Sequence, residues 1–403
     1  MNDTIRQFRD FFVSLKLTVV LLVLGLLLVF FATLDQVNLG IWAIQQKWFR
    51  SFFVLQDMKG IPVPIFPGGY FIGGLLLINL ISAHVYRFKF TWRKAGIFFT
   101  HIGLILLLVG ELLSGVWQQD YSMRIKEGQT VNYAEHFHND ELAIADVTDP
   151  GFDQVVAIPA SRLRPGETIS HPAMPFRITT RLFYPNSDAL PRSEVPNAPP
   201  PVDKGVIAER YVVEPRPMTY QQDERNVPAV AVEIAAADGS LGSWLLTTLV
   251  SVSRVVDGKP KLVPAEPFPL KFEHAGRKWE ISLRAARSYK PFALHLLDFS
   301  HDRYAGTNIP KNYSALVRIV TPDGQDDHEV KIYMNSPLRH GGFTFYQASF
   351  EGEDTTVLQV VRNPSWLMPY IACAVMSFGL LFQFCLHLVA FAGKRRAARP
   401  AAA

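Results

Sequence analysis

The sequence contains little charge and almost no cysteine. Only 19% of its 403 residues are charged, whereas a soluble domain usually carries about a quarter. Four long apolar runs account for this deficit, and they exclude an ordinary cytosolic protein. Mean hydropathy is nevertheless only +0.12, so most of the chain lies outside a membrane. These values predict a small helical membrane anchor joined to a large polar domain.

The two cysteines, Cys373 and Cys385, both lie inside the last apolar run. The polar domain therefore has no disulfide framework, thiolate metal site or cysteine nucleophile. A C-x-x-C-H motif is also absent, which excludes covalent attachment of a c-type haem to this chain. The cysteines are too far apart along one predicted helix to bond each other. We interpret both as packing residues.

The apolar runs predict four transmembrane helices in a 3+1 arrangement, over about 17–34, 68–86, 95–116 and 366–392. Each is near or above the roughly 20 residues that span a bilayer. Basic residues cluster at the N-terminus, in 87–94 and in the tail 393–403, so the positive-inside rule places both termini in the cytoplasm. This topology also explains the net charge of +4 without nucleic-acid binding. We expect a multi-pass protein of the bacterial inner membrane, with residues 35–67 and 117–365 on the extracytoplasmic (periplasmic) side.

The large domain, residues 117–365, is predicted to be β-rich and sandwich-like. Asp238-Gly239 and the turn 321–324 each separate two β-rich apolar runs, as hairpin turns do. Residues 278–283 alternate polar and apolar, as a half-buried strand does. The proline-rich stretch near 191–201 suggests a division into two lobes.

Three histidines lie within the predicted spans: His84, His101 and His387. Ionisable residues in a membrane are costly and indicate function. All three lie within roughly 5–10 Å of the cytoplasmic helix ends, and the short 87–94 loop makes two of their helices antiparallel neighbours. A cluster of imidazoles at this depth suits axial binding of haem iron, and interhelical hydrogen bonding is the other interpretation. His84 is the strongest candidate, because Asn79 and Ser82 give its helix further polar positions facing protein.

The remaining polar candidates have simpler interpretations. Glu111 falls near the outer end of its span, where a solvated carboxylate is expected. The pair His136 and His138 is compatible with metal binding, but without a third ligand we favour a surface pair. Phosphate loops, nucleophile elbows and zinc motifs are absent, and we identify no catalytic residue.

The sequence resembles the ResB family of System II cytochrome c biogenesis across nearly the whole chain. The resemblance is carried by residues 11–18 (FFVSLKLT), 79–88 (NLISAHVYRF), 96–106 (GIFFTHIGLIL), 298–307 (DFSHDRYAGT) and 334–350 (MNSPLRHGGFTFYQASF). The last of these stretches is the most specific. The 3+1 topology around a long outer domain agrees with it.

The resemblance implies a non-catalytic subunit of a cytochrome c synthetase complex. Such proteins work with a ResC-like partner to carry haem b outward and present it to apocytochrome c, whose thiols a separate reductant keeps reduced. The haem-binding histidine of the second span corresponds to His84, with the second ligand coming from the partner, and His101 also matches a family histidine. Since the seven tryptophans are scattered, the family's tryptophan-rich loop must belong to the partner. The β domain is then a scaffold for the partner and apocytochrome.

Two alternative functions remain open from the sequence. A b-type haem redox subunit would use paired histidines on its own helices, and a membrane-anchored binding or scaffold protein would need none of them. In the stretch 335–350, a binding edge and a core hairpin are both compatible with the sequence. We favour the core hairpin, because Phe343, Phe345 and Tyr346 would pack well.

Overall fold

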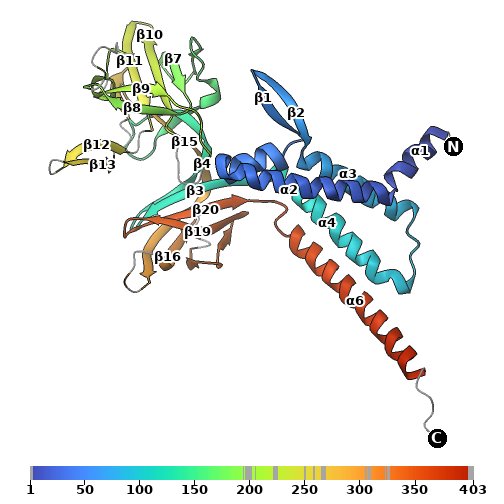
Figure 1. Ribbon diagram of the computed structural model, residues 1–403. Helices are drawn as coiled ribbons and strands as arrows, with labels where there is room; N and C mark the ends of the chain where they lie inside the picture. The colour runs from blue at the N-terminus through green and yellow to red at the C-terminus, as the bar shows by residue number, and fades with distance from the viewer. Residues whose placement is uncertain are drawn as a thin grey trace. The chain divides into compact units, whose positions relative to one another are not determined.

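The computed structural model describes residues 3–193, 195, 202–204, 206–220, 226–248, 251–256, 259–264, 269–304, 306, 310–322, 324 and 327–397. The chain divides into two compact units. One comprises residues 1–119, 220–222 and 362–403, and the other comprises residues 120–219 and 223–361. The first unit is helical and the second is built of β-strands (Figure 1).

Within the described residues, four helices are long and apolar enough to cross a membrane, which confirms the predicted spans. They are α2 (Leu15–Ile44), α3 (Gly69–Tyr86), α4 (Ala95–Trp117) and α6 (Met368–Ala397), and a short helix α1 (Asp3–Phe12) precedes them. Cys373 and Cys385 are exposed on α6, so their interpretation as packing residues is wrong. The reason is rotational: each lies about 120° around the helix from Gly379, which faces α4.

The segment 35–67, between the first two spans, is folded. Gly40 has φ 76°, which interrupts α2. The chain continues into a π-helical turn, η1 (Gln45–Phe49), which lies back against α2. Trp48 then stacks on Phe31 with ring centroids 6.4 Å apart. Asp35 accepts hydrogen bonds from Lys47 Nζ (2.7 Å) and Trp48 Nε1 (2.9 Å), which fix the reversal. A hairpin of β1 (Phe53–Met58) and β2 (Ile61–Pro67) follows.

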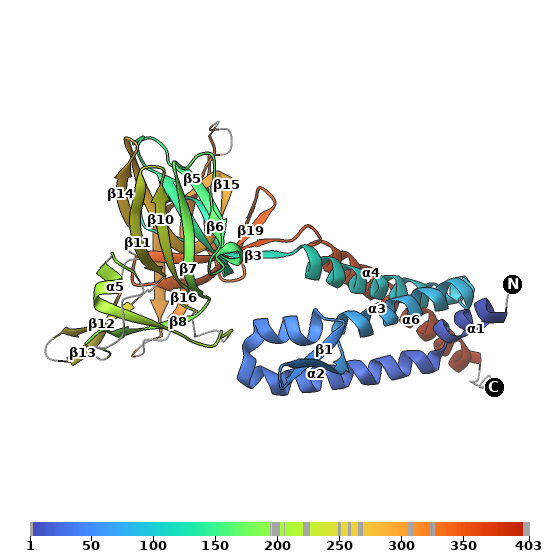
Figure 2. The same cartoon turned by 90° about the horizontal axis from the view of Figure 1, so that it is seen from above.

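Helices α4 and α6 lie side by side (Figure 2). Their backbones approach closely along a row of glycines spaced by seven residues: Gly96, Gly103 and Gly110. A Cβ atom added to Gly96 would lie only 2.5 Å from Gln383 Cβ, and one added to Gly103 would lie 2.9 Å from Met376 Cβ. Small residues allow this approach in membranes, where packing rather than water exclusion joins helices. A short 3₁₀ turn, η2 (Trp92–Lys94), leads into α4.

The second unit contains a ten-stranded antiparallel sheet in the order β17-β16-β15-β4-β3-β20-β19-β18, with β14 beside β15 and β5 beside β4. Its strands are β3 (Gln119–Lys126), β4 (Thr130–Asp146), β5 (Gln154–Pro159), β14 (Leu270–His274), β15 (Arg277–Arg303), β16 (Pro310–Val320), β17 (Glu329–Tyr333), β18 (Leu338–His340), β19 (Phe343–Glu351) and β20 (Thr355–Arg362). The hairpin predicted at 321–324 joins β16 to β17.

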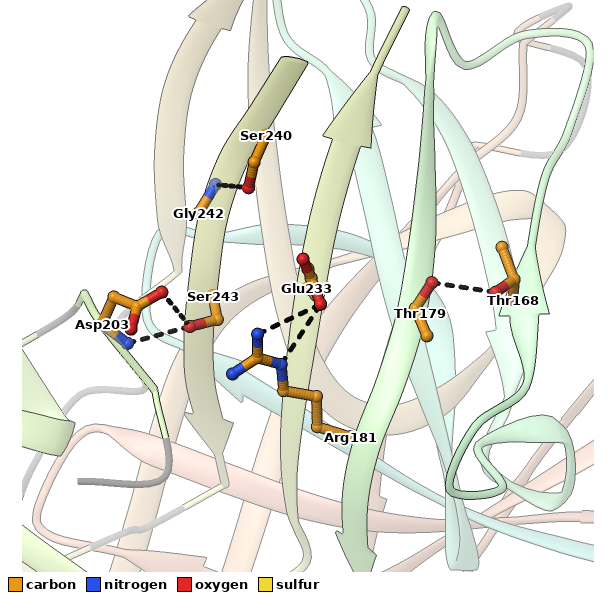
Figure 3. A network of polar contacts seen from close by, with 8 residues as sticks. All are labelled: Thr168, Thr179, Arg181, Asp203, Glu233, Ser240, Gly242 and Ser243. Atoms are coloured by element: carbon orange, nitrogen blue, oxygen red, sulfur yellow. Dashed lines mark hydrogen bonds and ion pairs between the residues drawn. The ribbon is translucent and has the colours of Figure 1, made fainter. Parts of the chain in front are cut away.

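A four-stranded sheet, in the order β11-β10-β7-β6, packs against part of the large one. Its strands are β6 (Thr168–Ile169), β7 (Phe176–Tyr184), β10 (Ala229–Ala236) and β11 (Gly239–Thr247), and the predicted Asp238-Gly239 turn joins the last two. Polar pairs tie its surface together (Figure 3): the hydroxyls of Thr168 and Thr179 are 2.9 Å apart, and Arg181 Nη2 lies 3.1 Å from Glu233 Oε2. The second unit also contains η3 (Ala160–Arg162), α5 (Val206–Arg210) and two small two-stranded sheets. One sheet pairs β8 (Ser187–Pro191) with β9 (Tyr211–Pro215), and the other pairs β12 (Ser251–Val256) with β13 (Lys259–Pro264).

Two hydrophobic cores share the long strands β4 and β15. Phe292, Leu294 and Leu296 of β15 belong to one core, whereas Trp279 and Ile281 of the same strand belong to the other. The second core lies between the two sheets, which confirms a sandwich-like β domain. Of the stretch 191–201, where the sequence suggests a division into lobes, residues 194 and 196–201 lie outside the described residues.

The stretch 334–350 forms the hairpin β18–β19, and its packing corrects one prediction. Phe345 is fully buried and Phe343 packs against the same core, as expected. Tyr346 is exposed, because successive strand residues point to opposite faces of a sheet. Gly341 and Gly342 form the turn with φ 57° and 79°. The core interpretation therefore holds for two of the three aromatic residues.

Candidate functional site: a histidine pair between two spans

His84 and His101 lie side by side in the membrane-spanning unit. His84 is in the last turn of α3 and His101 is in the second turn of α4. Only residues 87–94 connect the two helices, so they run antiparallel and bring these turns to the same level. The ring centroids are 4.8 Å apart, with an interplanar angle of 74°. The structure thus joins two of the three histidines that the sequence singles out.

One ring nitrogen of His84 forms a hydrogen bond, and the other has no hydrogen-bond partner among the described residues. Its Nδ1–H donates to the carbonyl oxygen of Leu80 at 3.2 Å, one turn back along α3. Because Nδ1 carries the proton, Nε2 presents a lone pair, and this buried atom has no hydrogen-bond partner among the described residues. His101 Nδ1 is likewise buried without a partner there. Unpaired buried polar atoms are uncommon and call for an explanation.

Phenylalanine side chains pack against the His84 side of the histidine pair. Phe88 stacks on His84 with centroids 5.1 Å apart, and Phe98 approaches the same ring at 6.2 Å. Phe88 and Phe98 are themselves 5.8 Å apart, and Phe90 lies 5.5 Å from Phe98. These residues lie in the helix ends and the connecting loop. The imidazoles therefore sit in an apolar, aromatic setting that suits a flat, apolar ligand.

Each histidine is carried by a helix that is fixed to a different neighbour. The Asn79 side chain of α3 accepts a hydrogen bond from Thr18 Oγ1 of α2 at 2.6 Å. Helix α4 instead contacts α6 through its glycines. Asn79 is a polar position that the sequence already indicates, whereas the glycine row was not predicted. The seven-residue spacing of Gly96, Gly103 and Gly110 within an apolar run was the available signal.

His387 makes a different contact. Its Nε2 lies 3.0 Å from Gln383 Nε2, which also donates to the carbonyl oxygen of Arg93 at 3.2 Å. His387 is therefore the acceptor, and this arrangement ties α6 to the turn before α4. Its ring contact among the described residues is to Gln383 and not to His84 or His101. The ligand roles predicted for the three histidines stay predictions.

The two histidines of the β domain, His136 and His138, occupy an irregular part of β4. Glu135 and Asp140 pair with residues 287 and 285 of β15, so residues 136–139 interrupt the ladder with β15, while His136 pairs with Tyr121 of β3 on the other side. The His136 ring packs against Tyr121 at 4.5 Å. Partial burial lowers the pKa of His136, and the nearby positive charge of Lys290 lowers it further. No group of three or more metal-ligating side chains occurs in the described part of the chain. Glu111 is exposed on α4.

Lys290 is a buried charge that the sequence did not reveal. Its side chain is enclosed in the β domain, where Nζ lies 4.5 Å from the ring centroid of Tyr121 and 3.9 Å from that of Phe343. It also donates to Ser288 Oγ at 2.9 Å. Such cation–π contacts offset part of the cost of burying an ammonium group. Because the lysine and the two rings come from three strands that are far apart in the sequence, no local pattern predicts these contacts.

The structure defines the class of the protein: a four-span helical membrane protein with a large β domain between the third and fourth spans and an intramembrane histidine pair. Comparison with known proteins agrees with the resemblance found in the sequence. A model of the ResB-like family matches residues 278–357, which run from β15 to β20. This part of the chain is therefore similar to the ResB-like family.

A curated relative supports the same assignment. Protein NrfI of Wolinella succinogenes is 34% identical over 94 residues, which is 23% of this chain and 10% of NrfI. The matched stretch thus spans about a tenth of that relative's length. The family-model match lies in the β domain and does not include His84 or His101.

Proposed function

We propose that this chain is a membrane subunit for cytochrome c biogenesis that carries haem across the membrane. In this proposal it acts with a ResC-like partner and presents haem for covalent attachment to apocytochrome c, whose thiols a separate reductant keeps reduced. The match of residues 278–357 to the ResB-like family supports a role in cytochrome c biogenesis, and so does the similarity to NrfI. The histidine pair supports the finer proposal that haem is the cargo.

The main support for the proposal is the Nε2 atom of His84, which is buried without a hydrogen-bond partner among the described residues. A histidine that binds a metal usually donates its other ring N–H to a carbonyl or carboxylate, which fixes the tautomer and the ring orientation. His84 already has this arrangement through Leu80. Neutral imidazole is an axial ligand of haem iron, and the neighbouring phenylalanines suit a porphyrin face. The site therefore offers one preoriented ligand in an apolar setting.

The spacing of the pair bears on which residues bind the iron. With metal–nitrogen bonds of about 2 Å, two imidazoles on opposite faces of one haem have ring centroids about 6 Å apart. His84 and His101 are 4.8 Å apart, which leaves no room for a porphyrin between them. In this arrangement His84 supplies one ligand and the partner supplies the other. His101 is the alternative ligand from this chain.

The depth of the site fits loading from one side of the membrane. His84 lies two residues before the end of α3 and His101 six residues after the start of α4, so both are within about 10 Å of the helix ends. The adjoining segment 87–94 is basic, and the positive-inside rule assigns it to the cytoplasm. We therefore infer that haem b enters from the inner leaflet and leaves toward the β domain, which serves as a scaffold outside the bacterial inner membrane.

A b-type haem redox subunit is the second candidate. The observation that favours it is that His84 and His101 both come from this chain, as paired axial ligands of such enzymes generally do. That function requires the helices to separate by more than 1 Å, since the present spacing is too short for two ligands of one iron. It predicts reversible reduction by quinol, whereas a haem carrier needs no quinone.

A complementation experiment tests the proposed function. Cells that depend on this chain are given His84→Ala, or His138→Ala as a control in the β domain, and covalently haem-stained cytochrome c is compared with the apocytochrome level. We expect His84→Ala to abolish holocytochrome, imidazole in the medium to restore part of it, and His138→Ala to leave it normal. Normal holocytochrome in the His84→Ala cells would contradict the proposal.

A further inference from the structure

Helix α1, which the proposed function does not use, is strongly amphipathic. At 3.6 residues per turn, its apolar side chains fall within an arc of about 120° and its charged ones on the opposite side. The apolar arc consists of Ile5, Phe8, Phe11 and Phe12, and the polar side includes Arg6, Gln7, Arg9 and Asp10. Ile5, Phe8 and Phe11 are 57%, 65% and 56% exposed. A large apolar face is thus left uncovered by the protein itself.

The elbow between α1 and α2 is bonded in a defined geometry. Ser14 is extended (φ −73°, ψ 128°), so the carbonyl groups of Phe12 and Val13 lose their regular helical partners, whereas that of Ser14 still accepts from Thr18 N at 3.4 Å. Side chains of α3 and of the residue that follows it replace those partners. Asn79 Nδ2 donates to the carbonyl oxygens of Phe12 (2.7 Å) and Ser14 (3.2 Å), and Arg87 Nη1 donates to that of Val13 (2.9 Å). A helix that simply continued into α2 would need none of these bonds.

The uncovered face of α1 is continuous with the lipid-facing surface of the first span. Leu15, Val19 and Leu22 are exposed on α2 and follow directly after the elbow. The formal charges on α1 cancel, since its sequence contains two arginines and two aspartates, and Arg9 is paired with Asp10 at 2.6 Å. Anionic headgroups are therefore not what would attract this helix. Acyl chains are the partner that fits an apolar, charge-balanced face at this position.

We infer that α1 lies in the plane of the membrane, with Ile5, Phe8 and Phe11 at the boundary of headgroups and acyl chains. Amphipathic helices with a strong polar face bind membranes in this way. The leaflet is the one that holds the histidine pair, because Arg87 and Asn79 tie α1 to the last turns of α3. The inference is independent of haem binding. Helix α1 would then anchor the end of α3 that carries His84 at a fixed depth in the membrane.

Spin-label accessibility tests the inference on the full chain. Both native cysteines are changed to serine, and a nitroxide is attached to Phe8→Cys or, as the matched polar-face control, to Gln7→Cys. The protein is placed in nanodiscs of phosphatidylcholine. Collision with oxygen, which concentrates in lipid, is compared with collision with a water-soluble nickel chelate. Leu22→Cys gives the lipid reference and the exposed Asp153→Cys gives the water reference.

We expect the oxygen-to-nickel ratio at position 8 to approach the lipid reference and to exceed the ratio at position 7 several-fold. Nickel collision as high at position 8 as at the water reference would overturn the inference. Low collision with both reagents at position 8 would also overturn it, since a protein partner or a second copy would then cover the face. Adding Asn79→Leu should increase the label's mobility at position 8, and unchanged mobility would contradict the role of the elbow.

Discussion

The glycine row between α4 and α6 allows a direct test of how the site is held in place. Gly103 lies two residues after His101 on α4. A Cβ atom at Gly103 would lie 2.8 Å from the carbonyl oxygen of Ala372, 2.9 Å from Met376 Cβ and 3.0 Å from Met376 N. None of these atoms belongs to the movable end of a side chain. Gly103→Ala must therefore push α6 away from α4.

The size of the effect follows from these contacts. Comfortable contacts between heavy atoms are about 3.5 Å or more, so the helices must separate by about half an ångström. Overpacking of this kind costs about 1–3 kcal/mol. The same change at Gly74 of α3 meets no atom within 4 Å. Gly74→Ala has the same intrinsic effect on a helix without the clash, so the difference between the two variants isolates the packing contribution.

The assay is reversible unfolding of the full chain in mild detergent by titration with dodecyl sulfate, followed by tryptophan fluorescence. We expect Gly103→Ala to lower the free energy of unfolding by about 1–3 kcal/mol relative to Gly74→Ala. Stabilities equal within about 0.5 kcal/mol, the usual effect of a harmless surface change, would refute the reasoning. Helices α4 and α6 would then accommodate a methyl group at position 103 without moving apart, contrary to the close contacts described above.

Two further predictions concern the β domain. Gly341→Ala should destabilise it more than Gly342→Ala, because both residues have positive φ but only a Cβ atom at position 341 would meet Phe292 Cε1, at 2.6 Å. We expect the free energy of unfolding to fall by about 1 kcal/mol for Gly342→Ala, from backbone strain alone, and by about 2–4 kcal/mol for Gly341→Ala, from strain and clash together. Thermal unfolding of the full chain measures both losses, and equal losses would contradict the contact. His136→Phe should remove an acid-sensitive component of stability, since a histidine with lowered pKa stabilises the fold above its unfolded pKa and loses that contribution as the pH falls. The native chain should therefore lose more stability than the variant between about pH 7 and pH 5, and parallel pH profiles would exclude this role.

The sequence was sufficient to predict the features that depend on local patterns. The four spans follow from run length, since only about 20 consecutive apolar residues can cross a bilayer. The hairpins at Asp238-Gly239 and 321–324 follow from turn residues between β-rich runs. The approach of His84 to His101 also follows from local information, because a loop as short as 87–94 permits only antiparallel neighbours.

Features that depend on distant segments could not be predicted in this way. The positive φ of Gly40 reverses the direction of the chain. The hydrogen bond from Lys47 to Asp35 and the hairpin that follows could not be predicted from the pattern of apolar residues. The rotation of α6 is set by its contact with α4, which lies more than 250 residues earlier in the chain. That rotation places Gln383 against the carbonyl oxygen of Arg93 and leaves the cysteines facing outward.

The central claim, that His84 holds the haem cargo, is tested most directly by spectroscopy of the purified chain with its ResC-like partner. Haem content and the Soret band are compared for the native protein, His84→Ala and His387→Ala, the last being a membrane histidine already bonded to Gln383. We expect loss of haem only from His84→Ala, with recovery when imidazole is added. Full haem content and an unchanged spectrum in His84→Ala would contradict it.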